Sequence, residues 1–201
     1  ATAASYPVQA ERWLPVIDAM LAATGSEPGA AADFAYARSR LAAEQGDLVT
    51  AESLLQQARG LWQEAGDDIS LARSGLGLTQ LLAMQGRFDE AETTIRASIA
   101  ALSVMPSAET VLVEMDARQN LATLLSYQER FVEAAEINSD LRQRYLSLLA
   151  AAAHPSEAAD LQMRVALVER DLALAQTYLD QPQSAETLLE GAVERLSLPE
   201  V

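Results

Sequence analysis

One short phrase occurs five times along this chain, and its spacing constrains the fold more than any other feature. Each copy begins with alanine, has a glutamate one or two residues later and places an apolar residue within the next helical turn. The leading alanines are 41, 40, 43 and 51 residues apart: Ala10, Ala51, Ala91, Ala134 and Ala185. A period of about 40 residues in a chain rich in Ala, Leu and Glu is typical of stacked two-helix units. We therefore predict an all-α solenoid that forms a single domain over residues 1–201.

Turn signals divide each period into two helices. Gly46-Asp47 and Gly86-Arg87 interrupt two of the periods, and glycine tolerates the left-handed backbone conformation that ends a helix. Glu129-Arg130 takes this place in the third period, and Pro182 lies in the first turn of the last helix, where its missing N–H is harmless. Ser107 is placed to cap the helix that follows it. The sequence predicts four helical hairpins, over residues 31–65, 69–104, 108–152 and 156–197.

Residues 7–24 match the second helix of a unit that lacks its first helix. Two origins fit this pattern. Either the chain is cut from a longer array of repeats, or these residues form a dedicated capping helix that covers exposed apolar surface. Pro15 would kink or shorten such a helix. The sequence leaves both origins open.

The composition excludes several classes of partner. All fourteen basic residues are arginine, and the net charge is −15, which argues against binding to nucleic acid or to an anionic membrane surface. The chain has no cysteine, which rules out disulfides and thiolate chemistry and fits a reducing compartment. No apolar run approaches the roughly 18 residues of a membrane span, and no signal peptide is visible. We expect a cytoplasmic protein.

Residues that could carry chemistry have simpler structural explanations. The single histidine, His154, stands in an Ala-rich linker without the partners of a catalytic triad or metal site. Gly75-Leu76-Gly77 lacks the third glycine and the preceding strand of a phosphate loop, so we expect these glycines to permit close helix packing. The pair Asp67-Asp68 suits a helix N-terminus, and Trp62 suits the core. We expect no enzymatic activity, no cofactor and no metal site.

Small residues recur at the positions where the predicted helices would cross. Aligned on the repeated alanine, the chain resembles the tetratricopeptide repeat (TPR) family, which has small residues at three such positions in each unit. Its spacing resembles the long-repeat variety found in kinesin light chains and in bacterial transcription activators of the maltose-regulator type. The matching residues, all small except Leu141, are Ser39, Ala51 and Ala58; Thr79, Ala91 and Ser98; Ala122, Ala134 and Leu141; and Ala173, Ala185 and Ala192.

This resemblance implies a right-handed superhelical solenoid with a concave groove lined by the first helix of each hairpin. Arginine and amide side chains there would suit an extended peptide, because amides pair with backbone and arginine with carboxylates. The function implied is a non-catalytic scaffold for a protein or peptide partner. An alternative is a ligand- or partner-sensing segment of a larger bacterial signalling or transcription regulator. The implied partner-binding residues are Tyr36, Arg40, Arg73, Gln80, Gln119, Asn120, Thr123, Tyr127, Arg170 and Tyr178.

Overall fold

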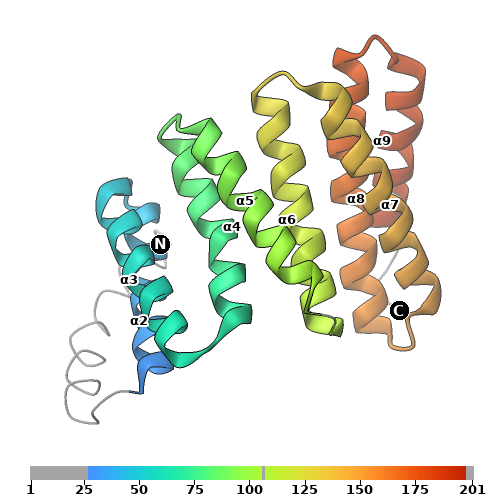
Figure 1. Ribbon diagram of the computed structural model, residues 1–201. Coiled ribbons are helices and arrows are strands. Elements are labelled where there is room, and N and C mark those ends of the chain that lie inside the picture. The colour runs from blue at the N-terminus through green and yellow to red at the C-terminus, as the bar shows by residue number, and fades with distance from the viewer. Residues whose placement is uncertain (1–26, 106, 198–201) are drawn as a thin grey trace, which may run out of the picture. The chain divides into compact units, whose positions relative to one another are not determined.

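The structure, a computed structural model, describes residues 27–105 and 107–197, and this part of the chain is built from α-helices (Figure 1). Successive helices pair as hairpins, so the all-α hairpin architecture expected from the repeats is confirmed. We call the first helix of each hairpin an A helix and the second a B helix. The helices are α2 (Pro28–Glu44), α3 (Leu48–Ala65), α4 (Asp68–Met84), α5 (Phe88–Ser103), α6 (Ala108–Tyr127), α7 (Phe131–Ala151), α8 (Pro155–Tyr178) and α9 (Pro182–Ser197).

Contacts divide the chain into two compact units. The first unit ends at Thr110, and the second begins at Val111, near the start of α6. Each unit is described by itself below. The single continuous domain over residues 1–201 stays a prediction, and the expected half repeat at residues 7–24 lies outside the described residues.

All four hairpins turn in the same way. Gly46, Gly86, Glu129 and Asp180 each have a positive φ, between 59° and 81°. In each turn the next residue donates its backbone N–H to a carbonyl five residues earlier, as in the 2.9 Å bond from Arg130 N to Leu125 O. This is the left-handed helix ending that glycine favours, because glycine has no Cβ to clash. Two of the four turns adopt it without glycine.

The predicted helix starts contain the expected caps. The Ser107 hydroxyl accepts a hydrogen bond from Thr110 N at 3.1 Å, and Asp67 Oδ1 accepts one from Ser70 N at 2.9 Å. Pro155 and Pro182 begin α8 and α9. His154 is the exposed residue just before α8, and its side chain makes no capping hydrogen bond. The hydrogen bonds to Ser107 and Asp67 satisfy backbone N–H groups that have no partner inside their helices.

The recurring small residues are buried where the helices of a hairpin cross. All twelve of the aligned positions are buried, including Leu141. In the first hairpin, Ser39 Oγ donates a 2.7 Å hydrogen bond to the carbonyl of Ala51, so the two helix backbones approach closely. A larger side chain at these positions would separate the helices. The repeat pattern in the sequence is therefore a pattern of helix contacts.

The two helix glycines behave differently from each other. A Cβ on Gly75 would lie 1.8 Å from Ser98 Oγ, so the expected close packing is confirmed there. A Cβ on Gly77 would meet its nearest neighbour, in Tyr36, at 3.6 Å, which is an ordinary contact. The expectation of close packing at Gly77 was therefore wrong, because the side chains of Tyr36 and Leu55 leave room for a Cβ there.

Each unit has its own apolar core. In the first unit Trp62 is buried as expected, packs with Tyr36 and Leu71, and donates a 3.1 Å hydrogen bond from Nε1 to Asp33 Oδ1. In the second unit, the fully buried Tyr145 of α7 packs against residues of α6 and α8. These residues are Met115, Leu161, Val165 and Val168.

Candidate functional site

A groove lies between the A helices of the first unit. We call it the first groove; it has a volume of about 340 Å³. Tyr36 and Arg40 come from α2, and Gln80 and Met84 from α4, which places three of the predicted partner-binding residues together. Its remaining lining residues are Ser39, Ala43, Glu44, Leu55, Gly77 and Leu81.

The first groove contains one tightly packed aromatic ring beside exposed polar side chains. The Tyr36 ring packs against Trp62, with ring centroids 5.5 Å apart, so the core holds this aromatic in place. Arg40 is exposed, and it makes no hydrogen bond or ion pair with any described residue. Gln80 and Met84 are also exposed. The groove therefore offers one positioned ring, one unpaired cation and one amide.

A second groove, of about 700 Å³, lies between the A helices of the second unit. It brings together four predicted residues, namely Thr123 and Tyr127 of α6 with Arg170 and Tyr178 of α8. The rings of Phe131 and Tyr178 are stacked, with centroids 4.2 Å apart and planes 3° from parallel. The other lining residues are Ser126, Glu129, Asp171 and Leu174.

The second groove presents exposed aromatic and apolar side chains. Tyr127 is 70% exposed and Tyr178 63%, and Leu174 is exposed beside them. Aromatic rings of this kind combine a large apolar surface with a polar tip, which suits them to recognition. Phe131, the first residue of α7, was not among the partner-binding residues predicted from the sequence. Its part in the groove depends on its contact with Tyr178, which the chain's local pattern does not reveal.

A short polar chain links α6 to α8 next to the second groove. Gln119 Nε2 donates to Asp171 Oδ2 at 3.2 Å, and Arg170 Nε donates to Asp171 Oδ1 at 2.8 Å. Gln119 thus contacts a groove residue without lining the groove itself. Asn120 is exposed one turn before Thr123 and is likewise not a lining residue.

Arg73 lies apart from the first groove. Its guanidinium pairs with the carboxylate of Glu109, and its Nε is buried without a hydrogen-bond partner. The family alignment places it on an A helix, but it does not line the first groove with the other predicted residues of the first unit. Arg73 is therefore a poor choice for testing the groove.

Neither a metal-binding cluster nor a membrane-spanning helix is found in the described part of the chain. Residues 27–105 and 107–197 contain no cluster of three His, Cys, Asp or Glu side chains that could hold a metal ion. Within the same ranges, no helix is both long and apolar enough to cross a bilayer.

Comparisons with known proteins identify the fold. No family model matches the sequence, and no curated protein matches it either. A solved structure described as a kinesin light chain of Podosopora anserina with nearly identical TPR-like repeats matches at a TM-score of 0.67 and 18% identity, over 95% of this chain and 87% of that one. This chain has the TPR-like repeat fold.

Other solved structures agree. BtubC (BKLC) from P. vanneervenii matches this TPR-like chain with a TM-score of 0.53 at 18% identity, over 95% of this chain and 89% of its own. MamA matches with a TM-score of 0.57 at 13% identity, over 91% and 86%. The resemblance predicted from the small residues is confirmed. Identities this low establish the fold alone, because one fold serves many functions.

Proposed function

We propose that this TPR-like protein is a non-catalytic scaffold whose A-helix grooves bind a segment of a partner protein. The TPR-like repeat fold is typical of protein-interaction scaffolds. The observation that carries the proposal is the pairing of exposed aromatic and apolar side chains with polar groups in the second groove. Tyr127, Leu174 and Tyr178 are exposed there beside Arg170.

The chemistry of the two grooves suits a peptide in an extended conformation. Such a peptide leaves its backbone N–H and C=O groups open, and Gln80 or Thr123 can pair with them. Arg40 has no partner within the described residues, so it can bind a carboxylate of the peptide without breaking an existing ion pair. Tyr127 and Tyr178 would contribute most of the binding free energy, because buried aromatic anchors dominate interfaces of this kind.

The test is a comparative capture experiment with the full chain as bait in extract of the source cell. One variant carries Tyr127→Ala and Tyr178→Ala, and a second carries Arg40→Ala and Gln80→Ala. Captured proteins are identified by mass spectrometry, and overlapping peptides covering each are titrated against purified bait. We expect a partner segment whose affinity falls roughly tenfold or more with the double tyrosine variant.

The matched control is Val49→Ala with Val132→Ala. Both valines are exposed on B helices and line neither groove. The control should leave capture unchanged, and circular dichroism should show equal helicity for all baits. A partner that binds every bait equally would place its site outside the grooves and overturn the proposal.

A further inference from the structure

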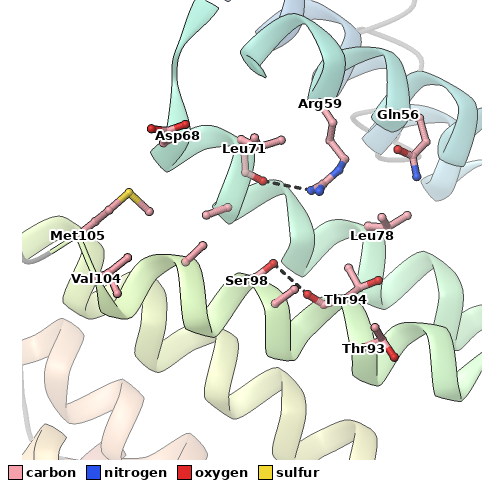
Figure 2. A pocket seen from close by; sticks show the side chains of 13 residues that line it. Gln56, Arg59, Asp68, Leu71, Leu78, Thr93, Thr94, Ser98, Val104 and Met105 are labelled. Atoms are coloured by element: carbon pink, nitrogen blue, oxygen red, sulfur yellow. Dashed lines mark hydrogen bonds between the residues drawn. The ribbon is translucent and has the colours of Figure 1, made fainter. Parts of the chain in front are cut away.

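A third groove lies in the first unit, between the B helices α3 and α5 and over α4. We call it the α3–α5 groove; it has a volume of about 650 Å³. Figure 2 shows Arg59 reaching from α3 to the carbonyl of Leu71 on α4, and both residues line the groove. The floor and far wall are mostly apolar. They include Leu71, Leu78, Ala97, Ala101, Val104 and Met105.

Arg59 is a partly buried cation without a carboxylate partner among the described residues. Its Nη1 donates to the Leu71 carbonyl at 3.1 Å (Figure 2). It also donates to Ser74 Oγ at 2.6 Å, and both acceptors are neutral. Asp68 also lines the groove but makes no ion pair with Arg59. Burial lowers the pKa of the Arg59 guanidinium, as expected for a charge that has lost water without gaining an opposite charge. A partly buried charge of this kind favours a ligand that would neutralise it.

In the second unit, the arginine at the same repeat position as Arg59 binds a carboxylate of the chain itself. Arg59 follows the small residue Ala58, and Arg142 follows Leu141 at the same position of the repeat. Arg142 Nε binds the carboxylate of the buried Glu169 at 2.8 Å.

The first unit lacks that carboxylate. In the repeat alignment Gly75 takes the place of Glu169, and Ala101 takes the place of Arg195, the second arginine that binds Glu169. The first unit therefore has the arginine without either of its charged neighbours, and Ala101 lines the open groove instead.

We propose that the α3–α5 groove binds an amphipathic helix of a partner protein that presents one Glu or Asp within its apolar face. Arg59 binds that carboxylate, and the apolar floor takes the flanking residues. A helix suits a groove bounded by helices, because its apolar side chains recur on one face at the spacing of a turn. The remaining surface of the partner helix is neutral or basic, since this chain carries a net charge of −15 and repels acidic partners. This site is separate from the two A-helix grooves.

The experiment selects peptides from a phage-displayed library with the full chain as bait. Each library member is an amphipathic helix of about five turns with Leu and Ala on its apolar face and Lys and Gln elsewhere. A single position in the centre of the apolar face is fully randomised. We expect Glu or Asp to be enriched at this position.

Two bait variants locate the binding site. Arg59→Gln removes the cation and should weaken the selected peptides roughly tenfold or more. Ser74→Asp should do the same while keeping Arg59, because it places a carboxylate next to Nη1 and so imitates the internal pairing of the second unit. If the Arg59→Gln substitution unfolds the bait, the Ser74→Asp bait still tests whether Arg59 binds the peptide.

Arg170→Gln, in the second groove, is the control that separates this proposal from the proposed function. It should leave the selected peptides bound. Loss of binding with Arg170→Gln alone would place the peptides in the second groove and overturn the inference. Selection without enrichment of an acidic residue, failure to select any peptide, or equal binding to the Ser74→Asp bait would each overturn it as well.

Discussion

Arg142 Nε donates a 2.8 Å hydrogen bond to Oε1 of Glu169, whose side chain is only 1% exposed. Arg195 Nε binds the other oxygen, Oε2, at 3.1 Å. One buried carboxylate on α8 thus joins α7 to α9. Gly191 lies beside it, and a Cβ at that residue would meet Oε2 at 3.7 Å, an ordinary contact. Burial of a carboxylate costs several kcal/mol, so the two guanidinium groups must offset this cost.

The first prediction concerns this buried triad. Glu169→Ala should reduce the free energy of unfolding of the second unit by about 3 kcal/mol, because two partly buried guanidinium groups lose the anion that they share. Urea unfolding followed by circular dichroism measures the change. A loss below about 1 kcal/mol would mean that water solvates both guanidinium groups well enough to replace the lost carboxylate.

A triple variant separates the charge from the packing. Replacing Arg142 and Arg195 with Met and Glu169 with Leu removes all three charges of the triad but keeps side chains of similar volume. We expect this variant to recover most of the lost stability, because apolar replacement of buried ion pairs is often neutral. Failure to recover would show that the helix contacts depend on the hydrogen-bond geometry itself.

The second prediction concerns the two hairpin turns that lack glycine. Glu129 has a φ of 61° and Asp180 a φ of 59°. Residues with a Cβ are strained in this region, and Asp tolerates it better than Glu does. Glu129→Gly should therefore stabilise the chain by about 0.5–1 kcal/mol, and Asp180→Gly should stabilise it less.

Gly86→Ala is the reverse change in an equivalent turn of the first unit, where φ is 75°. Apart from the two chain neighbours, no described residue has an atom within 4 Å of the position of the added Cβ, so any loss of stability there comes from the backbone and not from a clash. Thermal melting of the three variants should rank Glu129→Gly highest and Gly86→Ala lowest. An unchanged melting temperature for Glu129→Gly would show that its turn carries no strain.

The helical hairpins could be predicted because each depends on local and repeated signals. Ala51, Ala91 and Ala134 recur at the helix crossings, and Gly46 and Gly86 mark the turns. The observed helix bounds lie within a few residues of the expected ones. Periodicity predicts these features well, since they depend on sequence spacing and on backbone conformation.

The grooves could be predicted only in part, because their composition depends on contacts between distant residues. The alignment placed Tyr36, Arg40 and Gln80 on the correct helices, and they do lie together. It could not show that Arg73 pairs with Glu109. Glu169 was missed altogether; its only signal is a charged residue at a position whose helical neighbours, Val165 and Leu172, are apolar.

The last prediction concerns pH. The Ser70 backbone N–H and hydroxyl stabilise the charged Asp67 carboxylate at the start of α4, and so lower its pKa below the usual value. Because the folded-state pKa is the lower one, this carboxylate stabilises the fold above the pKa of the unfolded chain. The stabilisation is lost as the pH falls below about 4 and through the folded-state pKa.

Two substitutions test this contribution. Asp67→Ala should cost about 1 kcal/mol at pH 7, because the cap is lost. Asp67→Asn keeps a capping oxygen but does not titrate, so its deficit relative to the natural chain at pH 7 should shrink at pH 3. Urea unfolding at both pH values measures the two differences. If the Asn variant differs from the natural chain equally at both, the charge of Asp67 contributes nothing and its capping geometry accounts for the whole effect.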